Sequence, residues 1–356
     1  MSNRHGLLIT SLYVFAFLCL YCLKRLLIKK DEKRYRVFII IFEWINVFLP
    51  MAFLFTLNGK WLFSDEYLPS QLPQDLIFST FHFLMIGVSL LLTIIYLKKA
   101  RQEQTKTKTY FWGKLNQVDY EVFKFGVLLI SIELYKQLVY LNLRNGLDNY
   151  AWFGFPLQFC SLPLYLFLIT PFIKNKKIQD SLYYYLALYS LAAGLSVTLT
   201  GMGVFTLDVS ISLHTMIWHG SMIVVGLYIG ASKKFGQNYR QYISATIVLL
   251  ATIVFIQIVN TTFHYLSFKN PNLEAFDGFY ISPWGVSSNI PYLSSLRNIL
   301  HEANVPIFVT GFLISLLYFL VAALMGFLIF LLYQHNYKRL ENKKFKEETL
   351  LSSEDN

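Results

Sequence analysis

A cysteine, Cys160, lies in an unusual part of an apolar segment, FPLQFCSLPLYL, residues 155–166. Prolines flank it on both sides, and Gln158 precedes it by two positions. A helix that only fills a bilayer needs none of these residues. If Pro156 occupies the first turn of a helix, Cys160 lies one turn further along. The positive end of the helix dipole would then lower the pKa of the thiol. The pattern suggests a thiol nucleophile, with a small apolar filler as the alternative.

A thiol nucleophile needs a base, and a thiolate beside an imidazole is the usual activated pair. His219 is a candidate because Gly220 follows it, in IWHGSM, and glycine lets a neighbouring helix approach closely. Cys160 and His219 have similar predicted depths in the membrane. Depth alone does not place them in contact, so the Cys–His pair is a hypothesis at this point.

Other polar side chains interrupt the apolar segments, where they are costly and become functional candidates. They are His82, Glu133, Lys136, His214, Gln257, Asn260 and His264. Glu133 and Lys136 are three residues apart and can share one helix face as an ion pair, either structural or catalytic. His214 and His219 point about 140° apart on one helix. Since no acidic cluster or H-E-x-x-H pattern accompanies them, we expect no metal site and no cofactor.

The elements that position these residues are apolar blocks of roughly 20 residues, each long enough to span a bilayer as a helix. Hydrophobic residues make up 55% of the 356-residue chain, and the mean hydropathy is +0.46. We therefore predict an all-α, polytopic transmembrane helical bundle. Its nine predicted spans are approximately 6–23, 37–57, 76–97, 122–143, 156–173, 182–201, 212–230, 242–266 and 305–333.

The net charge of +10 follows the topology of the chain. Most of the 31 Lys and Arg residues fall in alternate connections, which the positive-inside rule assigns to the cytoplasm. The N-terminus is then outside and the C-terminus cytoplasmic, as an odd number of spans requires. This distribution argues against a nucleic-acid partner and for an integral protein of the cell membrane.

The chain divides into three predicted parts. Residues 1–75 hold two N-terminal helices and an outer loop, 76–335 form the main helical core, and 336–356 are a charged cytoplasmic tail that we expect to be disordered. In the core, nearly all polar side chains lie in the outer half of the predicted spans. This indicates a polar site near the outer leaflet, which the long outer loop 267–304 could cover.

Several motifs together resemble the YwaF-like integral membrane family, whose animal members include transmembrane protein 164. FPLQFC resembles its LPLHLC motif, IWHGSM its His-Gly motif, and FSTFHF its helix with an early histidine. VNTTFHYLSFKNP and SPWG resemble its NYMFL..KP and GPWP segments. The resemblance covers about residues 76 to 335. Gln158 replaces the histidine of LPLHLC, and His264 stands where the family usually has asparagine.

The resemblance implies a helical bundle that transfers lipid acyl chains through an acyl-cysteine, with Cys160 as nucleophile and His219 as general base. Glu133 and His82 would complete the catalytic set. We assign the remaining polar residues to substrate binding, with membrane phospholipids as partners: Lys136, Gln158, His214, Gln257, Asn260 and His264. Two alternatives stay open, a small-solute transporter and a non-catalytic membrane partner protein. The sequence does not define the oligomeric state.

Overall fold

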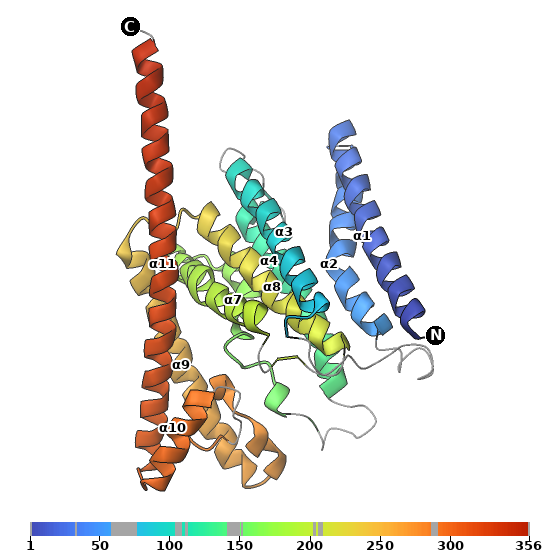
Figure 1. The fold of residues 1–356 in the computed structure, drawn as a ribbon. Helices are drawn as coiled ribbons and strands as arrows, with labels where there is room; N and C mark the ends of the chain where they lie inside the picture. Colours follow the sequence, from blue (N-terminus) through green and yellow to red (C-terminus); the bar gives the residue numbers. More distant parts are fainter. Residues whose placement is uncertain are drawn as a thin grey trace.

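The chain folds into a bundle of helices, as the sequence predicts (Figure 1). The computed structural model describes residues 2–32, 34–57, 77–103, 109–110, 113–140, 150, 152–201, 204–205, 209–285 and 291–354. The predicted domain boundary at 75/76 and the predicted end of the fourth span, 141–143, lie outside these residues. Within them the strands are limited to one antiparallel pair, β1 (Thr109–Tyr110) and β2 (Leu115–Asn116).

The N-terminal half of the described chain contains four long helices. They are α1 (Ser2–Asp31), α2 (Arg36–Leu57), α3 (Thr80–Glu103) and α4 (Gln117–Tyr140). The rest of the chain contains α5 (Leu162–Ile169), α6 (Lys176–Tyr185), α7 (Leu191–Thr200), α8 (Val209–Ser232), α9 (Tyr239–Ser267), α10 (Pro291–Glu302) and α11 (Ile307–Glu354). Short 3₁₀ turns are η2 (Trp152–Gly154), η3 (Thr170–Phe172), η5 (Pro271–Ala275) and η6 (Gly278–Tyr280), and a π-turn, η4 (Leu186–Ser190), joins α6 to α7.

Six helical stretches of the described chain are long and apolar enough to cross a membrane, judged by length and composition. They are Arg36–Leu57, Thr80–Arg101, Lys176–Thr200, Ser210–Ser232, Tyr239–Ser267 and Ile307–Asn342. Three of the nine predicted spans are not among these stretches: 6–23 in α1, 122–143 in α4 and 156–173 in α5. Charged side chains run along the length of α4, and α5 has only 8 residues.

Two helix boundaries that lie away from Cys160 show how the structure differs from the sequence expectation. The helix predicted to begin at 182 begins at Lys176, because the side chain of Asn175 caps its first turn and accepts from the backbone N–H groups of Lys177 and Ile178. The expectation of a disordered tail is wrong, since α11 continues as a helix to Glu354. Its charged end follows directly from an apolar helix, which supplies the nucleus that a short isolated helix lacks.

Helix α8 lies at the centre of the bundle and packs against α3, α4 and α7. Within its apolar stretch 72% of the residues are buried, compared with 11% in those of α2 and α11. Small residues allow this packing. A Cβ at Gly194 of α7 would lie 2.8 Å from the carbonyl oxygen of His219, and one at Gly220 would clash with the hydroxyl of Ser89 on α3.

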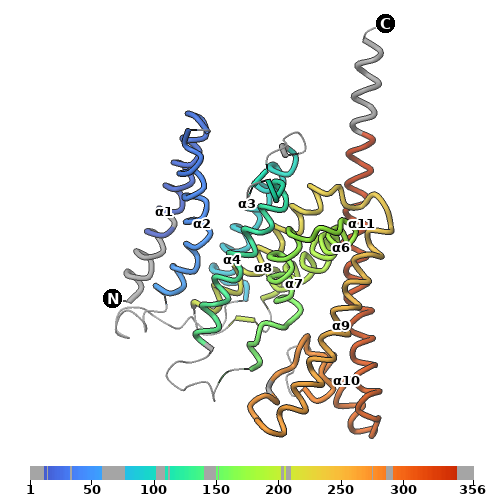
Figure 2. Tube along the Cα trace, turned by 180° about the vertical axis from the view of Figure 1, so that it is seen from behind, coloured from blue at the N-terminus to red at the C-terminus, as the bar shows by residue number. Residues whose placement is uncertain are grey.

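Different helices lie on the two flanks and at the two ends of the bundle, as both views show (Figures 1 and 2). The pair α1–α2 lies on one flank, and α9 and α11 lie on the other. The η5–η6 segment and α10 gather at the end that is opposite the C-terminus. Residues 276–285, here called the strap, belong to that end.

Candidate functional site

The segment that carries Cys160 is not helical. Helix α5 begins at Leu162, two residues after Cys160, with Ser161 at its N-cap. The prediction that Pro156 opens this helix and places Cys160 one turn inside it is therefore wrong. The proline in the first turn is Pro163, which fits there because its missing N–H would have no helical partner.

Three side-chain hydrogen bonds hold this segment, and two of them end on its own backbone oxygens. The hydroxyl of Tyr165 on α5 donates to the carbonyl of Pro156 at 2.9 Å. The amide nitrogen of Gln158 donates to the carbonyl of Asp277 in the strap at 2.9 Å. The indole N–H of Trp218 on α8 donates to the carbonyl of Cys160 at 2.8 Å. The position of Cys160 thus depends on α5, the strap and α8 together.

Cys160 itself is a free, partly buried cysteine packed at the edge of the main hydrophobic core. An unperturbed thiol, with a pKa of about 8.5, is largely protonated at neutral pH. A reaction at this sulfur needs a base that removes the proton as the bond forms.

A buried ionic cluster lies between α4 and α8, at the level of Cys160. Oε1 of Glu133 lies 2.7 Å from the ammonium of Lys136 and 2.5 Å from the amide nitrogen of Gln137. Its other oxygen, Oε2, lies 3.5 Å from Nε2 of His214. The helix-face pairing predicted for Glu133 and Lys136 is thus present, and His214 joins it from the neighbouring helix.

Trp218 connects this cluster to the cysteine. Its ring stacks on that of His214, with centroids 5.4 Å apart and planes at 28°. The ammonium of Lys136 lies 5.8 Å from the centre of the indole ring, within the range of a cation–π contact. The indole is only 3% exposed. Sequence reasoning missed Trp218, because a tryptophan in an apolar helix is ordinarily a packing residue.

The state of His219 is defined by one hydrogen bond. Its Nδ1 lies 2.8 Å from the carbonyl oxygen of Thr215. A carbonyl only accepts, so Nδ1 carries the proton and Nε2 carries the lone pair. Nε2 is buried and has no hydrogen-bond partner. His219 follows Trp218 directly in α8, but no hydrogen bond joins it to Cys160 in the described structure.

His82 is not part of the Cys160 segment or the Glu133 cluster, and both nitrogens of its ring are hydrogen-bonded. Nε2 lies 2.8 Å from the carbonyl oxygen of Thr198 on α7, and Nδ1 accepts from the backbone N–H of Phe78 at 3.1 Å. The side chain is completely buried. Both ring nitrogens are therefore engaged, and His82 joins α3 to the end of α7. This arrangement leaves no ring nitrogen for proton transfer.

The polar residues of α9 hold the strap. The amide nitrogen of Gln257 lies 2.8 Å from the carbonyl oxygen of Ile281. The amide of Asn260 makes two bonds to the backbone of Gly278, at 3.1 and 2.8 Å. The ring of His264 stacks on Trp284 at 4.0 Å. These three residues, which we assigned to substrate binding, contact the strap and not the Glu133 cluster.

The strap also contains a buried ion pair that sequence reasoning missed. Oδ2 of Asp277 lies 3.1 Å from the guanidinium of Arg297 on α10, and Oδ1 accepts from the backbone N–H of Ser282 at 2.8 Å. Phe279 and Tyr280 have positive φ values of 58° and 59°, which bulky residues rarely adopt. Surrounding bonds must stabilise such a conformation. In the sequence, charges in a polar loop gave no sign of burial.

A second buried ionic network occupies the opposite end of α4. It joins α1, α2, α3 and α4 through Lys24, Glu43, Lys99, Glu121 and Lys124, with N···O distances from 2.5 to 3.2 Å. Glu121 is completely buried. Buried charged groups therefore occur at both ends of α4, and not only near Glu133.

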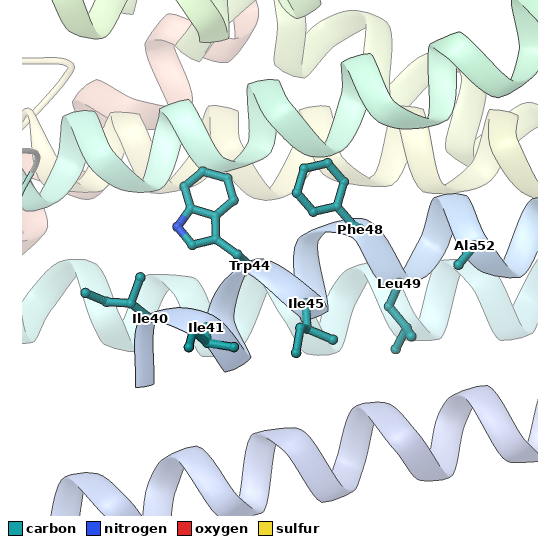
Figure 3. A pocket seen from close by; sticks show the side chains of 7 residues that line it. All are labelled: Ile40, Ile41, Trp44, Ile45, Phe48, Leu49 and Ala52. Atoms are coloured by element: carbon teal, nitrogen blue, oxygen red, sulfur yellow. The ribbon is translucent and has the colours of Figure 1, made fainter. Parts of the chain in front are cut away.

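One groove lies on the surface of α2 (Figure 3). Its lining residues are Ile40, Ile41, Trp44, Ile45, Phe48, Leu49 and Ala52. The exposed area of this lining is almost entirely apolar, so it has no group that does chemistry. It suits contact with lipid chains and is separate from Cys160. Among the described residues, no group of three or more His, Cys, Asp or Glu side chains is placed to hold a metal ion.

Taken together, the apolar helices and the buried polar clusters define an integral membrane protein built as a helical bundle. The chain belongs to the TMEM164 family, whose model matches residues 77–288. This confirms the resemblance seen in the motifs. Comparisons with curated proteins and with solved structures gave no match. The matched region includes Cys160, His219 and the Glu133 cluster, whereas α1 and α2 precede it.

Proposed function

We propose that this protein is a membrane-embedded acyltransferase or transacylase that acts on phospholipids through an acyl-cysteine at Cys160. The observation that carries the proposal is the unpartnered Nε2 of His219. A buried imidazole nitrogen with a lone pair and no partner is rare in a folded protein and is suited to accept a proton. In α8, His219 directly follows Trp218, whose indole N–H donates to the Cys160 carbonyl.

The first half-reaction forms a thioester. Nε2 of His219 accepts the thiol proton while the sulfur of Cys160 attacks the ester carbonyl of a phospholipid. The C–O bond to the glycerol oxygen then breaks, and His219 returns the proton to that oxygen as the lysophospholipid leaves. Because the thiol is protonated at rest, proton removal and attack must be coupled. In the second half-reaction, His219 takes the proton of an acceptor hydroxyl, which attacks the thioester and releases the thiol.

The Glu133 cluster supplies charge near this chemistry. Lys136 and His214 are donors that would stabilise the oxyanion on the carbonyl under attack, and Glu133 holds both in place. Gln158 would bind substrate through its buried Oε1, which has no hydrogen-bond partner. Since both ring nitrogens of His82 are bonded, the proposal gives His82 no part in proton transfer.

The proposal includes a topology. Nine spans, with the N-terminus outside and the C-terminus in the cytoplasm, would make this a multi-pass protein of the cell membrane. Residues 1–75 would precede a core at 76–335, and 336–356 would extend α11 into the cytoplasm. The charge bias of the connections supports this arrangement. The Cys160 segment and the strap would then lie near the outer leaflet.

A small-solute transporter remains the second candidate, because buried ionic groups occur at both ends of α4 and intramembrane charges often mark ion pathways. Uptake that survives loss of Cys160 would favour it. Tolerance of substitution at both Cys160 and His219 would favour a non-catalytic partner protein.

The test is to trap the acyl-enzyme. Purified protein is incubated with phospholipids that carry labelled acyl chains, quenched in acid and examined by intact mass. We expect a hydroxylamine-sensitive adduct of one acyl chain on the wild type and on the Cys19→Ala/Cys22→Ala variant, and none on Cys160→Ala. The proposal is refuted if no adduct forms with several lipid classes, or if the adduct persists in Cys160→Ala.

A further inference from the structure

The carbonyl of Cys160 cannot obtain a hydrogen bond from the start of its own helix. The residue three positions later is Pro163, which has no N–H. The next N–H, from Leu164, donates to Ser161 at 3.1 Å. A buried carbonyl without a donor is costly. The indole N–H of Trp218 supplies the donor from another helix.

The indole is itself fixed by its surroundings. The ring of His214 stacks against the indole, and the Lys136 ammonium lies over the indole ring. Glu133 contacts both of these groups. A continuous series of contacts therefore runs from Glu133 on α4, through His214 and Lys136, to Trp218 and the backbone of Cys160.

From this geometry we propose that Trp218 is a positioning residue for Cys160: its indole N–H orients the cysteine segment, and the Glu133 cluster acts on the cysteine through it. The inference rests on the proposed function for its effect on catalysis. Its structural part does not, because the reactivity of the thiol toward a simple reagent also depends on how firmly the segment is held.

Trp218→Phe is the informative variant, because phenylalanine keeps an aromatic ring beside His214 and Lys136 but has no N–H. Trp44→Phe in the α2 groove is the matched control. Both are made in the Cys19→Ala/Cys22→Ala background, where Cys160 is the remaining thiol. The first measurement is the rate of alkylation by N-ethylmaleimide. The second is the rate of acyl-adduct formation at saturating and at limiting lipid.

We expect Trp218→Phe to be alkylated about 3- to 10-fold faster than the background, since loss of the hydrogen bond to the Cys160 carbonyl loosens the segment. Its maximal acylation rate should fall at least about tenfold, with an unchanged half-saturating lipid concentration and a melting temperature lowered by only a few degrees, so that the variant stays folded under the assay conditions. Trp44→Phe should match the background in both assays.

An unchanged alkylation rate in Trp218→Phe would overturn the inference, as would rates of alkylation and acylation that change only at temperatures where the variant has begun to unfold. The two proposals fail separately. If the wild type forms no acyl adduct, the acyltransferase proposal fails, while faster alkylation of Trp218→Phe would still support the positioning role.

Discussion

Lys124 of α4 and Glu43 of α2 form a largely buried ion pair, with the ammonium nitrogen 3.2 Å from Oε1 of Glu43. The pair joins the two parts of the chain that the family match separates, since Lys124 lies inside the matched residues and Glu43 precedes them. Tyr120 adds a second link by donating to Oε2 of Glu43 at 3.2 Å. The carboxylate of Glu43 thus makes two polar links between α2 and the family core, in addition to the packing of Trp44 and Phe55 against rings of α4.

Neutralising that carboxylate should loosen the attachment. In Glu43→Gln the size of the side chain is kept, but Lys24 and Lys124 lose a negative partner. Removing one partner of a fully buried ion pair costs about 3–5 kcal/mol, and we expect about 2 kcal/mol here because the site is partly accessible. Thermal unfolding in detergent should show a lower melting temperature than the wild type. Glu274→Gln at an exposed site is the control, and equal melting temperatures for the two variants would contradict the role of Glu43.

Two of the buried histidines of the core, His219 and His82, should behave oppositely. His219→Ala removes the unpartnered base and should slow acyl-adduct formation by about 10²- to 10⁴-fold, with little change in melting temperature. His82→Ala removes a ring that bonds both to Phe78 and to Thr198. It should lower the free energy of unfolding by about 1–3 kcal/mol. Adduct kinetics and thermal unfolding, measured on both variants, test the contrast. Equal rates of adduct formation in the two would be inconsistent with His219 as the base.

The strap should be more stable at mildly acidic pH. Burial raises the pKa of Asp277 from 3.8 to about 6, although Ser282 and Arg297 oppose the shift. The folded protein then holds a proton that the unfolded chain releases between about pH 4 and pH 6. The contribution of Asp277 to the free energy of unfolding is therefore largest below pH 4. It falls as the pH rises through 6, by roughly 3 kcal/mol for a pKa shift of this size.

The measurement for Asp277 is thermal unfolding at several pH values, combined with limited proteolysis of the strap. Asp277→Asn cannot titrate and serves as the control. As the pH rises from 4 to 6, the wild type should lose stability relative to Asp277→Asn. Above pH 6 the difference between the two should stay constant. A difference that is constant across this range would show that Asp277 keeps an ordinary pKa in the folded protein.

The sequence predicted the all-helical class, the family and the pairing of Glu133 with Lys136, because each depends on hydropathy or on helix spacing over a few residues. It failed at the start of α5, where two prolines offered two possible first turns. Packing against Trp218 and the strap decides in favour of Pro163. Spacing along the chain does not contain that information.

The ion pairs that tie separate elements together, which the sequence did not predict, join residues far apart in the chain. Asp277 and Arg297 form an ion pair across a turn with two positive φ values. Lys124 and Glu43 form an ion pair although they are 81 residues apart in the sequence. Such pairs depend on which helix faces rotate toward each other. A single sequence records the charges and their predicted depth, but not their partners.

The series of contacts from Glu133 to Cys160 predicts a specific pattern of non-additivity. Glu133→Gln removes the charge that holds Lys136 and His214, so acylation should slow by about tenfold and alkylation of Cys160 should speed up. If Glu133 acts through Trp218, the Glu133→Gln/Trp218→Phe double variant should be little worse than Trp218→Phe alone. Glu43→Gln is the comparison, because nine residues of helix place Lys124, its partner, about 14 Å along α4 from Glu133. Its effect on both rates should simply add to that of Trp218→Phe. Additive losses for Glu133→Gln and Trp218→Phe would instead mean that Glu133 reaches the reaction directly, as a charge beside the ester carbonyl.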